Sequence, residues 1–305
     1  MKASEQQAMD STDKLLSMAE SLIDKGGSAL RRFREEVLID LDGRLKVISD
    51  KIGEDGVDPF GMDPECLRRT AVAASFLYKM YFRCSTVGID NVPDGPVIIV
   101  ANHAGQLPID GLMITTALIM EGARPRLARS MVDRWVPTVP FISTFYARNG
   151  VTLGTPENAL LLLKRGEALL TFPEGLAGIT KTVDKAYQLQ KFGLGFMRLA
   201  LATGAPIIPV SVLGSEEQYP TLYNLESLGK IVGLPAVPIW AQMIVPVFGL
   251  LPLPVKYHLE FGEPMYFASD ADEEDATVSL LVDDVRVAIN DMLEDQRGQR
   301  RSLFW

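Results

Sequence analysis

Residues 97–110 read Val-Ile-Ile-Val-Ala-Asn-His-Ala-Gly-Gln-Leu-Pro-Ile-Asp, an apolar run that leads into a histidine and then an aspartate. The apolar run is typical of a buried strand, and Pro108 suits the first position of a following helix. His103 is then expected just past the strand, and Asp110 in the first turn of the helix, where the helix dipole favours an ionised carboxylate. A neutral imidazole can accept a hydroxyl proton near neutral pH, and a nearby carboxylate fixes its tautomer and stabilises the imidazolium. The stretch therefore predicts a general base, His103, oriented by Asp110.

Short apolar runs alternate with helical patterns around this stretch. Strands are expected at residues 97–101, 126–128, 168–172, 207–213 and 257–261. Helices are expected at residues 111–121, 156–165, 193–203 and 277–294. The alternation predicts an α/β fold. Because Phe172-Pro173-Glu174-Gly175 also follows a strand, both motifs are expected to open onto one end of the sheet, where ligands of open α/β folds bind.

The N-terminal part of the chain has a different pattern. Residues 10–50 carry apolar residues at helical spacing, 53–59 form a Gly- and Asp-rich loop, and 66–81 read as a third helix. We therefore expect an amphipathic helical extension over residues 1–58 and the main domain over 59–305. The N-terminus lacks the apolar stretch of a secretory signal, which predicts a protein kept inside the cell.

Composition limits the kinds of site that the chain can hold. With 305 residues and 47% hydrophobic content the chain can bury one large core. Cys66 and Cys84 are too few for a disulfide framework and, with only His103 and His258 as imidazoles, make no convincing zinc site. His258 reads as a strand residue without a catalytic role. No metal or dinucleotide-binding motif is expected, because Gly193-Leu194-Gly195 lacks the third glycine of that fingerprint.

The net charge of −9 is unevenly placed, and the acidity lies mostly outside the segment that carries the motifs. Several cations in or near that segment are candidates for binding phosphate or anionic lipid, with ordinary solvated helix faces as the alternative. They are Arg124, Arg126, Arg129, Arg134, Lys181, Lys185, Lys191 and Arg198. Lys181 is the one that we predict to bind substrate.

Residues 231–255 include no charged residue, and an apolar helix of this length would cross a bilayer. Five prolines, however, break any continuous helix over this segment. We expect this segment either at a membrane interface or in the core. Trp240 and Phe248 suit a headgroup boundary or the wall of an acyl-chain tunnel.

The order of these motifs resembles the glycerolipid acyltransferase superfamily, typified by 1-acylglycerol-3-phosphate acyltransferase. The resemblance spans residues 102–210: Asn-His…Asp, then Phe145-Tyr146-Ala147-Arg148, then Phe172-Pro173-Glu174-Gly175, then Pro206-Ile207-Ile208-Pro209-Val210. It implies a mixed central sheet flanked by helices. It also implies transfer of a fatty acyl group from acyl-CoA or acyl carrier protein to a lysophospholipid or glycerolipid hydroxyl at an anionic membrane surface, with no cofactor and no nucleic acid. The predicted location is peripheral, on the inner face of the cell membrane.

The resemblance also implies roles for single residues. His103 is the base and Asp110 its orienting partner, Arg148 binds the acceptor phosphate, and Glu174 and Gly175 belong to the acceptor site. The chain departs from the family pattern in having six residues between His103 and Asp110 instead of four, which Gly105 can accommodate as a bend. The arginine block and the residues after Gly175 also differ, which leaves open an acyltransferase with a non-phosphate acceptor, a hydrolase, or a non-catalytic lipid-binding relative.

Overall fold

The structure is a computed structural model that describes residues 39–50, 58–105, 107–136, 142–225, 237–244 and 251–304, with the single positions 27, 37, 227, 229 and 249. Its contacts divide the chain into two compact units, Met1–Gly43 and Arg44–Trp305. The site lies entirely within the second unit. The boundary predicted after residue 58 stays a prediction, as does the helical extension, most of which lies outside the described residues.

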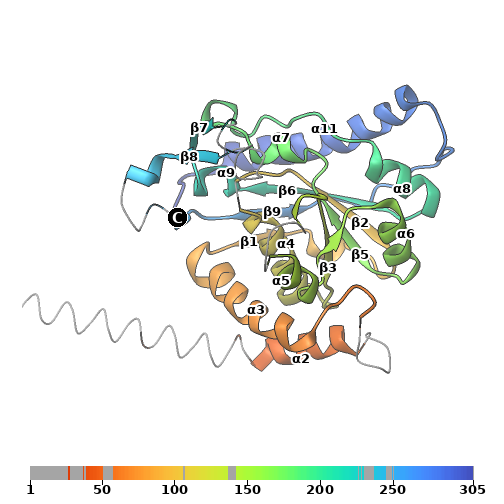
Figure 1. Ribbon diagram of the computed structural model, residues 1–305, viewed down its shortest axis with the longest axis horizontal. Coiled ribbons are helices and arrows are strands. Elements are labelled where there is room, and N and C mark those ends of the chain that lie inside the picture. Colours follow the sequence, from red (N-terminus) through yellow and green to blue (C-terminus); the bar gives the residue numbers. More distant parts are fainter. Residues whose placement is uncertain are drawn as a thin grey trace, which may run out of the picture. The chain divides into compact units, whose positions relative to one another are not determined.

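The centre of the second unit is a seven-stranded mixed sheet in the order β1-β9-β6-β2-β5-β3-β4 (Figure 1). Its strands are β1 Ser85–Val87, β2 Val97–Ala101, β3 Ala128–Val132, β4 Thr152–Leu153, β5 Ala168–Thr171, β6 Ile207–Leu213 and β9 His258–Phe261. All neighbours pair in parallel except β6 and β9, which are antiparallel. The predicted α/β fold with a mixed central sheet is confirmed.

Helices cover both faces of this sheet (Figure 1). The helices are α2 Ile39–Ser49, α3 Pro64–Phe76, α4 Ile109–Met120, α5 Ile142–Arg148, α6 Pro156–Lys164, α7 Leu176–Ile179, α8 Gly195–Thr203, α9 Ser215–Gln218 and α11 Asp275–Gln299. Helical turns lie at Leu77–Tyr81, Ile89–Asn91, Val183–Lys185 and Ala241–Ile244.

Two apolar cores explain why the strand sequences are continuously hydrophobic. Val97, Ile99 and Ala101 of β2 pack with α4, whereas Ile98 and Val100 pack with α6, α8 and α11 on the opposite face. Successive side chains of a strand point to opposite faces, so a strand covered on both sides is apolar at most of its positions.

A separate two-stranded antiparallel ribbon is formed by β7 Thr221–Leu225 and β8 Val237–Trp240. The charge-free segment 231–255 thus enters β8 and the turn at Ala241–Ile244, while most of its other residues lie outside the described part. Among the residues that the structure describes, none of the helices combines the length and the apolarity needed to cross a membrane.

Candidate active site

His103 and Asp110 meet at the carboxyl end of β2. The Nδ1 atom of His103 lies 2.6 Å from Oδ2 of Asp110, whose side chain is fully buried. The main-chain N–H groups of Ala104 and Gly111 donate to the same carboxylate at 3.1 and 2.7 Å. The carboxylate is therefore held in place by its own helix start and loop, and its contact with Nδ1 leaves Nε2 of the imidazole to face a substrate.

The long spacer between the two residues bends at Gly105. This residue has φ of +79°, a conformation that strains any residue with a Cβ. A Cβ added there would also lie 2.6 Å from Nε2 of the buried Gln218. The expectation that Gly105 allows the two extra residues to loop out is confirmed.

His103 stacks on Phe172, with ring centroids 4.2 Å apart and planes 23° from parallel. Phe172 directly follows β5, which pairs in parallel with β2, so the two motifs do open onto the same end of the sheet. Gly178 packs closely against the main chain of His103, because a Cβ at that position would lie 2.9 Å from the carbonyl oxygen of His103. Phe172 and Asp110 restrain the imidazole, and Gly178 leaves room for the main chain that carries it.

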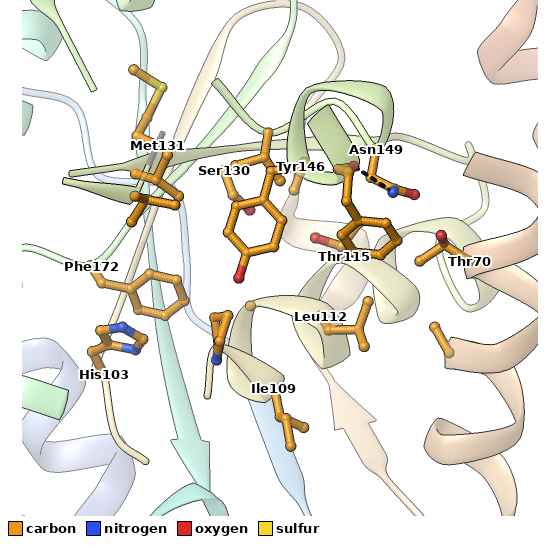
Figure 2. Close-up of a pocket in the computed structure, with 18 of the residues that line it drawn as sticks. Thr70, His103, Ile109, Leu112, Thr115, Ser130, Met131, Tyr146, Asn149 and Phe172 are labelled. Carbon is orange, nitrogen blue, oxygen red and sulfur yellow. Dashed lines mark hydrogen bonds between the residues drawn. The ribbon is translucent and has the colours of Figure 1, made fainter. Parts of the chain in front are cut away.

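A cavity of about 400 Å³ opens beside His103. Figure 2 shows His103 and Phe172 together on one side of it and Thr70 and Asn149 on the other, with Tyr146 reaching in. Most of the wall is apolar and comes from α3, α4, β3 and α5; it includes Leu67, Ala71, Ile109, Leu112, Ile119, Met131, Val136 and Phe145. Its size and lining are those of a site for a largely apolar ligand. The contribution of α3 to this wall carries no motif and was missed from the sequence, whereas Phe145 and Tyr146 of α5 belong to a quoted motif whose place in the wall was not predicted.

Glu174 holds the main chain of the loop that carries His103. Its Oε1 accepts the N–H of His103 at 2.9 Å and its Oε2 accepts the N–H of Gln190 at 2.7 Å. The residue is buried and is not part of the cavity wall. Its predicted role in acceptor binding stays a prediction, and the contacts observed are those of a residue that positions His103.

Lys181 is buried between two carboxylates. Its Nζ lies 3.4 Å from Oε2 of Glu174 and 2.7 Å from Oε1 of Glu216. Burial raises the pKa of the Glu216 carboxyl, although the ammonium of Lys181 acts in the opposite direction. Lys181 is not part of the cavity wall, and its predicted role in binding substrate stays a prediction. Glu216 carries no motif and was missed from the sequence.

Gly175 does line the cavity, at the start of α7. Its N–H donates to the carbonyl oxygen of Phe172 at 2.9 Å, so this amide is already engaged in the turn and is not free for a developing oxyanion.

Comparisons with known proteins agree with this architecture. Residues 83–213 match the family model described as "Acyltransferase". An uncharacterized protein of Mycobacterium tuberculosis is 38% identical over 268 residues, which cover 83% of this chain and 73% of that protein. The chain belongs to the acyltransferase family.

Two further relatives of this acyltransferase carry functional names. A chicken protein named "DGAT1/2-independent enzyme synthesizing storage lipids" is 28% identical over 191 residues, 62% of this chain and 54% of that protein. A Mycoplasma pneumoniae protein named "Probable 1-acyl-sn-glycerol-3-phosphate acyltransferase" is 28% identical over 148 residues, 46% of this chain and 53% of that protein. The crystal structure of the 1-acyl-sn-glycerophosphate acyltransferase PlsC from Thermotoga maritima matches with a TM-score of 0.50 and 18% identity, over 77% of this chain and 81% of that one. This likeness supports the same fold.

Arg148 of the acyltransferase is not brought to the cavity. It ends α5, its side chain is exposed, and its main-chain carbonyl group accepts the N–H of Asp63 at 3.0 Å. Phe145 and Tyr146 of the same helix do line the cavity. A role for Arg148 in binding phosphate stays a prediction.

Several of the other predicted cations are engaged in the fold. The guanidinium of Arg129 forms a buried ion pair with Asp58 at 2.8 Å. Arg126 donates to main-chain carbonyl groups, including that of Gly166 at 2.9 Å. Arg198 contacts Asp275 at 2.6 Å, and Arg124 pairs with Asp94. These four side chains have partners within the protein, and none of them lines the cavity.

His258 lies in a strand, as predicted. It lies in β9, where Nδ1 is 2.6 Å from Oγ of Ser85. Burial lowers its pKa, with Lys256 and Arg300 acting in the same direction. Within the described part of the chain, no group of three or more His, Cys, Asp or Glu side chains is arranged to hold a metal ion.

Proposed function

We propose that this acyltransferase moves a fatty acyl group from acyl-CoA or acyl carrier protein to a hydroxyl of a lysophospholipid or other glycerolipid. The observation that carries the proposal is the 2.6 Å contact between His103 and the buried Asp110, placed on the wall of a largely apolar cavity. A cavity of this kind suits the hydrocarbon chain of a lipid, and the histidine lies where a reacting group at the end of that chain would sit.

The proposed reaction needs one proton acceptor. Nε2 of His103 takes the proton of the acceptor hydroxyl while the oxygen attacks the carbonyl carbon of the thioester. The carbon–sulfur bond then breaks, and the imidazolium returns the proton to the leaving thiolate. Asp110 steadies the positive ring between these steps, and general-base help of this kind is typically worth about 10²–10⁴ in rate.

A phosphate-bearing acceptor would need a cation, and Arg148 is the residue that we propose for it. Its position on α5, three residues after Phe145, which lines the cavity, supports this role.

A second candidate is transfer to a lipid acceptor without phosphate. It is favoured by one observation: among the described residues that line the cavity, none is Arg or Lys. The chicken relative, an enzyme named for the synthesis of storage lipids, is compatible with this candidate.

We further propose that the enzyme is cytoplasmic and binds peripherally to the inner face of the cell membrane, since its lipid acceptor resides there. If the purified protein does not bind anionic vesicles even at low salt, this location is contradicted.

An acceptor panel tests the proposed function. The purified protein is supplied in parallel with acyl-CoA and acyl carrier protein donors, with and without lysophosphatidate, lysophospholipids, monoacylglycerol and diacylglycerol. Thiol release that depends on an acceptor supports transfer, and the preferred acceptor separates the two candidates. Release without any acceptor indicates a hydrolase, and no release with either donor indicates a lipid-binding relative.

A further inference from the structure

The ribbon β7–β8 and the segment beside it expose large apolar side chains. Leu222 and Tyr223 of β7 are 53% and 62% exposed, and Leu251 is 55% exposed. Leu225 and Met243 are also exposed. We call these five residues the hairpin face. Single exposed apolar residues are ordinary on a protein surface, but a cluster on one ribbon marks a surface that contacts another apolar medium.

The hairpin face adjoins the wall of the cavity. The side-chain amide of Asn224 donates to the carbonyl oxygen of Thr180 at 2.7 Å, which ties β7 to the residue that follows α7. Leu176 and Ile179 of α7 line the cavity, and Leu176 is itself exposed. The ribbon is thus tied to the end of α7, and α7 lines the cavity where we propose that lipid reacts.

Charge around the ribbon favours an apolar contact over a Coulombic one. The described residues 237–244 and 251–255 include no charged residue. The nearby cation Lys181 is buried against Glu174 and Glu216 and is not presented to the surface. Trp240 of β8, a residue type enriched at headgroup depth in membranes, packs against Tyr219 with ring centroids 4.6 Å apart and planes tilted by 35°.

We propose that the hairpin face is the surface that docks onto the phospholipid bilayer, with its apolar side chains inserted among the headgroups and upper acyl chains. The proposal rests on the proposed function, because a lipid substrate has to pass between the bilayer and the cavity, and the ribbon is tied to α7, which lines that cavity. Interfacial binding of this kind scales with the apolar area inserted and is supplemented by attraction to anionic lipids.

Vesicle binding of a triple variant tests the proposal. The variant Leu222→Gln/Tyr223→Gln/Leu251→Gln removes apolar surface from exposed positions, and its thermal unfolding is compared with that of the natural protein. In flotation with phosphatidylcholine–phosphatidylglycerol vesicles we expect its partition coefficient to fall at least about tenfold. Binding of the natural protein is expected to persist largely at high salt, because it is driven by apolar insertion.

A matched control lies elsewhere on the molecule. Tyr266, Leu280 and Val287 are comparably exposed. Tyr266 follows Met265, which pairs with Ile207 at the start of β6, and this is the end of the sheet opposite His103. The variant Tyr266→Gln/Leu280→Gln/Val287→Gln is expected to bind vesicles like the natural protein. Equal binding of all three proteins, equal loss in both variants, or no binding of the natural protein would overturn the proposal.

Two further readouts separate docking from catalysis. With short-chain, water-soluble donor and acceptor, the hairpin variant is expected to keep the turnover of the natural protein and to lose activity only on vesicles. If vesicle binding depends on the hairpin face but the natural protein transfers no acyl group, the docking surface is supported and the proposed function is rejected. In the variant Trp135→Phe/Trp305→Phe, fluorescence of Trp240 is expected to be quenched by brominated lipids; no quenching in bound protein would contradict insertion of the ribbon.

Discussion

Oε1 of Glu174 accepts the main-chain N–H of His103 at 2.9 Å, across 71 positions of sequence. The contact joins the two motifs that most clearly carry the resemblance to acyltransferases. It exists because β2 and β5 are parallel neighbours, so that the residues after both strands leave the sheet at the same edge. The same carboxylate reaches the amide of Gln190 and Lys181, which makes Glu174 the link between the catalytic loop and the segment that follows α7.

Substitution of Glu174 should therefore affect turnover more than substrate affinity. Glu174→Ala removes the acceptor for two main-chain N–H groups, and we expect kcat to fall about 10–100-fold because His103 is displaced. Glu174→Gln keeps an oxygen for His103 and should restore much of that loss. If Glu174 binds the acceptor instead, steady-state kinetics will show a raised KM for the acceptor with kcat nearly unchanged in both variants.

Replacement of Gly105 should damage the loop for two separable reasons. Gly105→Ala places a Cβ at φ of +79° and 2.6 Å from the side-chain amide of Gln218. We expect a loss of activity and of about 1–3 kcal/mol in the free energy of unfolding, measured by denaturant titration. In Gly105→Ala/Gln218→Ala the steric contact is removed while the backbone strain remains, so recovery should be partial. Full activity of the single variant would mean that the bend at Gly105 is not required.

Arg148 offers a test of the acceptor headgroup. If it binds the acceptor phosphate, Arg148→Ala should raise the KM for lysophosphatidate about tenfold or more, the usual cost of a lost charge-assisted contact, and leave that for a neutral glyceride unchanged. Arg286→Ala, which removes a partly exposed arginine of α11, is the control. If Arg148→Ala changes the KM for both acceptors equally, Arg148 has a structural role and does not bind phosphate. That result would favour the candidate acceptor without phosphate.

The buried pair between Asp58 and Arg129 predicts a dependence of stability on pH. Burial raises the pKa of Asp58, but the hydrogen bond and charge of Arg129 and the N–H groups of Met62 and Phe60 outweigh it, and the pKa is lowered below 3.8. A lowered pKa contributes stability above the pKa of the unfolded state that is lost as the pH falls through the folded value. Asp58→Asn leaves Arg129 buried without its partner and should cost about 3–5 kcal/mol at pH 7. Thermal unfolding between pH 7 and about 3 should show this difference shrink below about pH 4; a difference independent of pH would contradict the assignment.

The fold was predictable where a strand is covered on both faces. Residues 97–101 and 207–213 form β2 and β6 with the predicted bounds, since a short, continuous apolar run is typical of a strand that is buried on both faces. The strand predicted at 126–128 instead lies at Ala128–Val132. Arg126, the first residue of the predicted range, lies before the strand, and its guanidinium donates to main-chain carbonyl groups. The short edge strands β1 and β4 were missed, because two or three residues carry no periodicity.

The candidate site was also predictable only in part. His103 and Asp110 were found because they belong to one local strand–loop–helix unit, whose geometry follows from Gly105 and Pro108. The cavity wall from α3 and the buried contact of Lys181 with Glu216 depend on tertiary packing between distant segments. A charged side chain in a sequence gives no sign of whether it will face a ligand or a buried partner, and Lys181 and Arg129 both face buried partners.

The two histidines of the chain give the most direct test of the proposed chemistry. His103→Ala removes the proposed base, whereas His258→Asn changes a histidine of β9 that contacts Ser85. With the preferred acceptor and matched thermal unfolding, we expect kcat of His103→Ala to fall at least about a hundredfold, and that of His258→Asn to stay close to the natural value. A folded His103→Ala protein that still transfers acyl groups at nearly the natural rate would contradict the central claim.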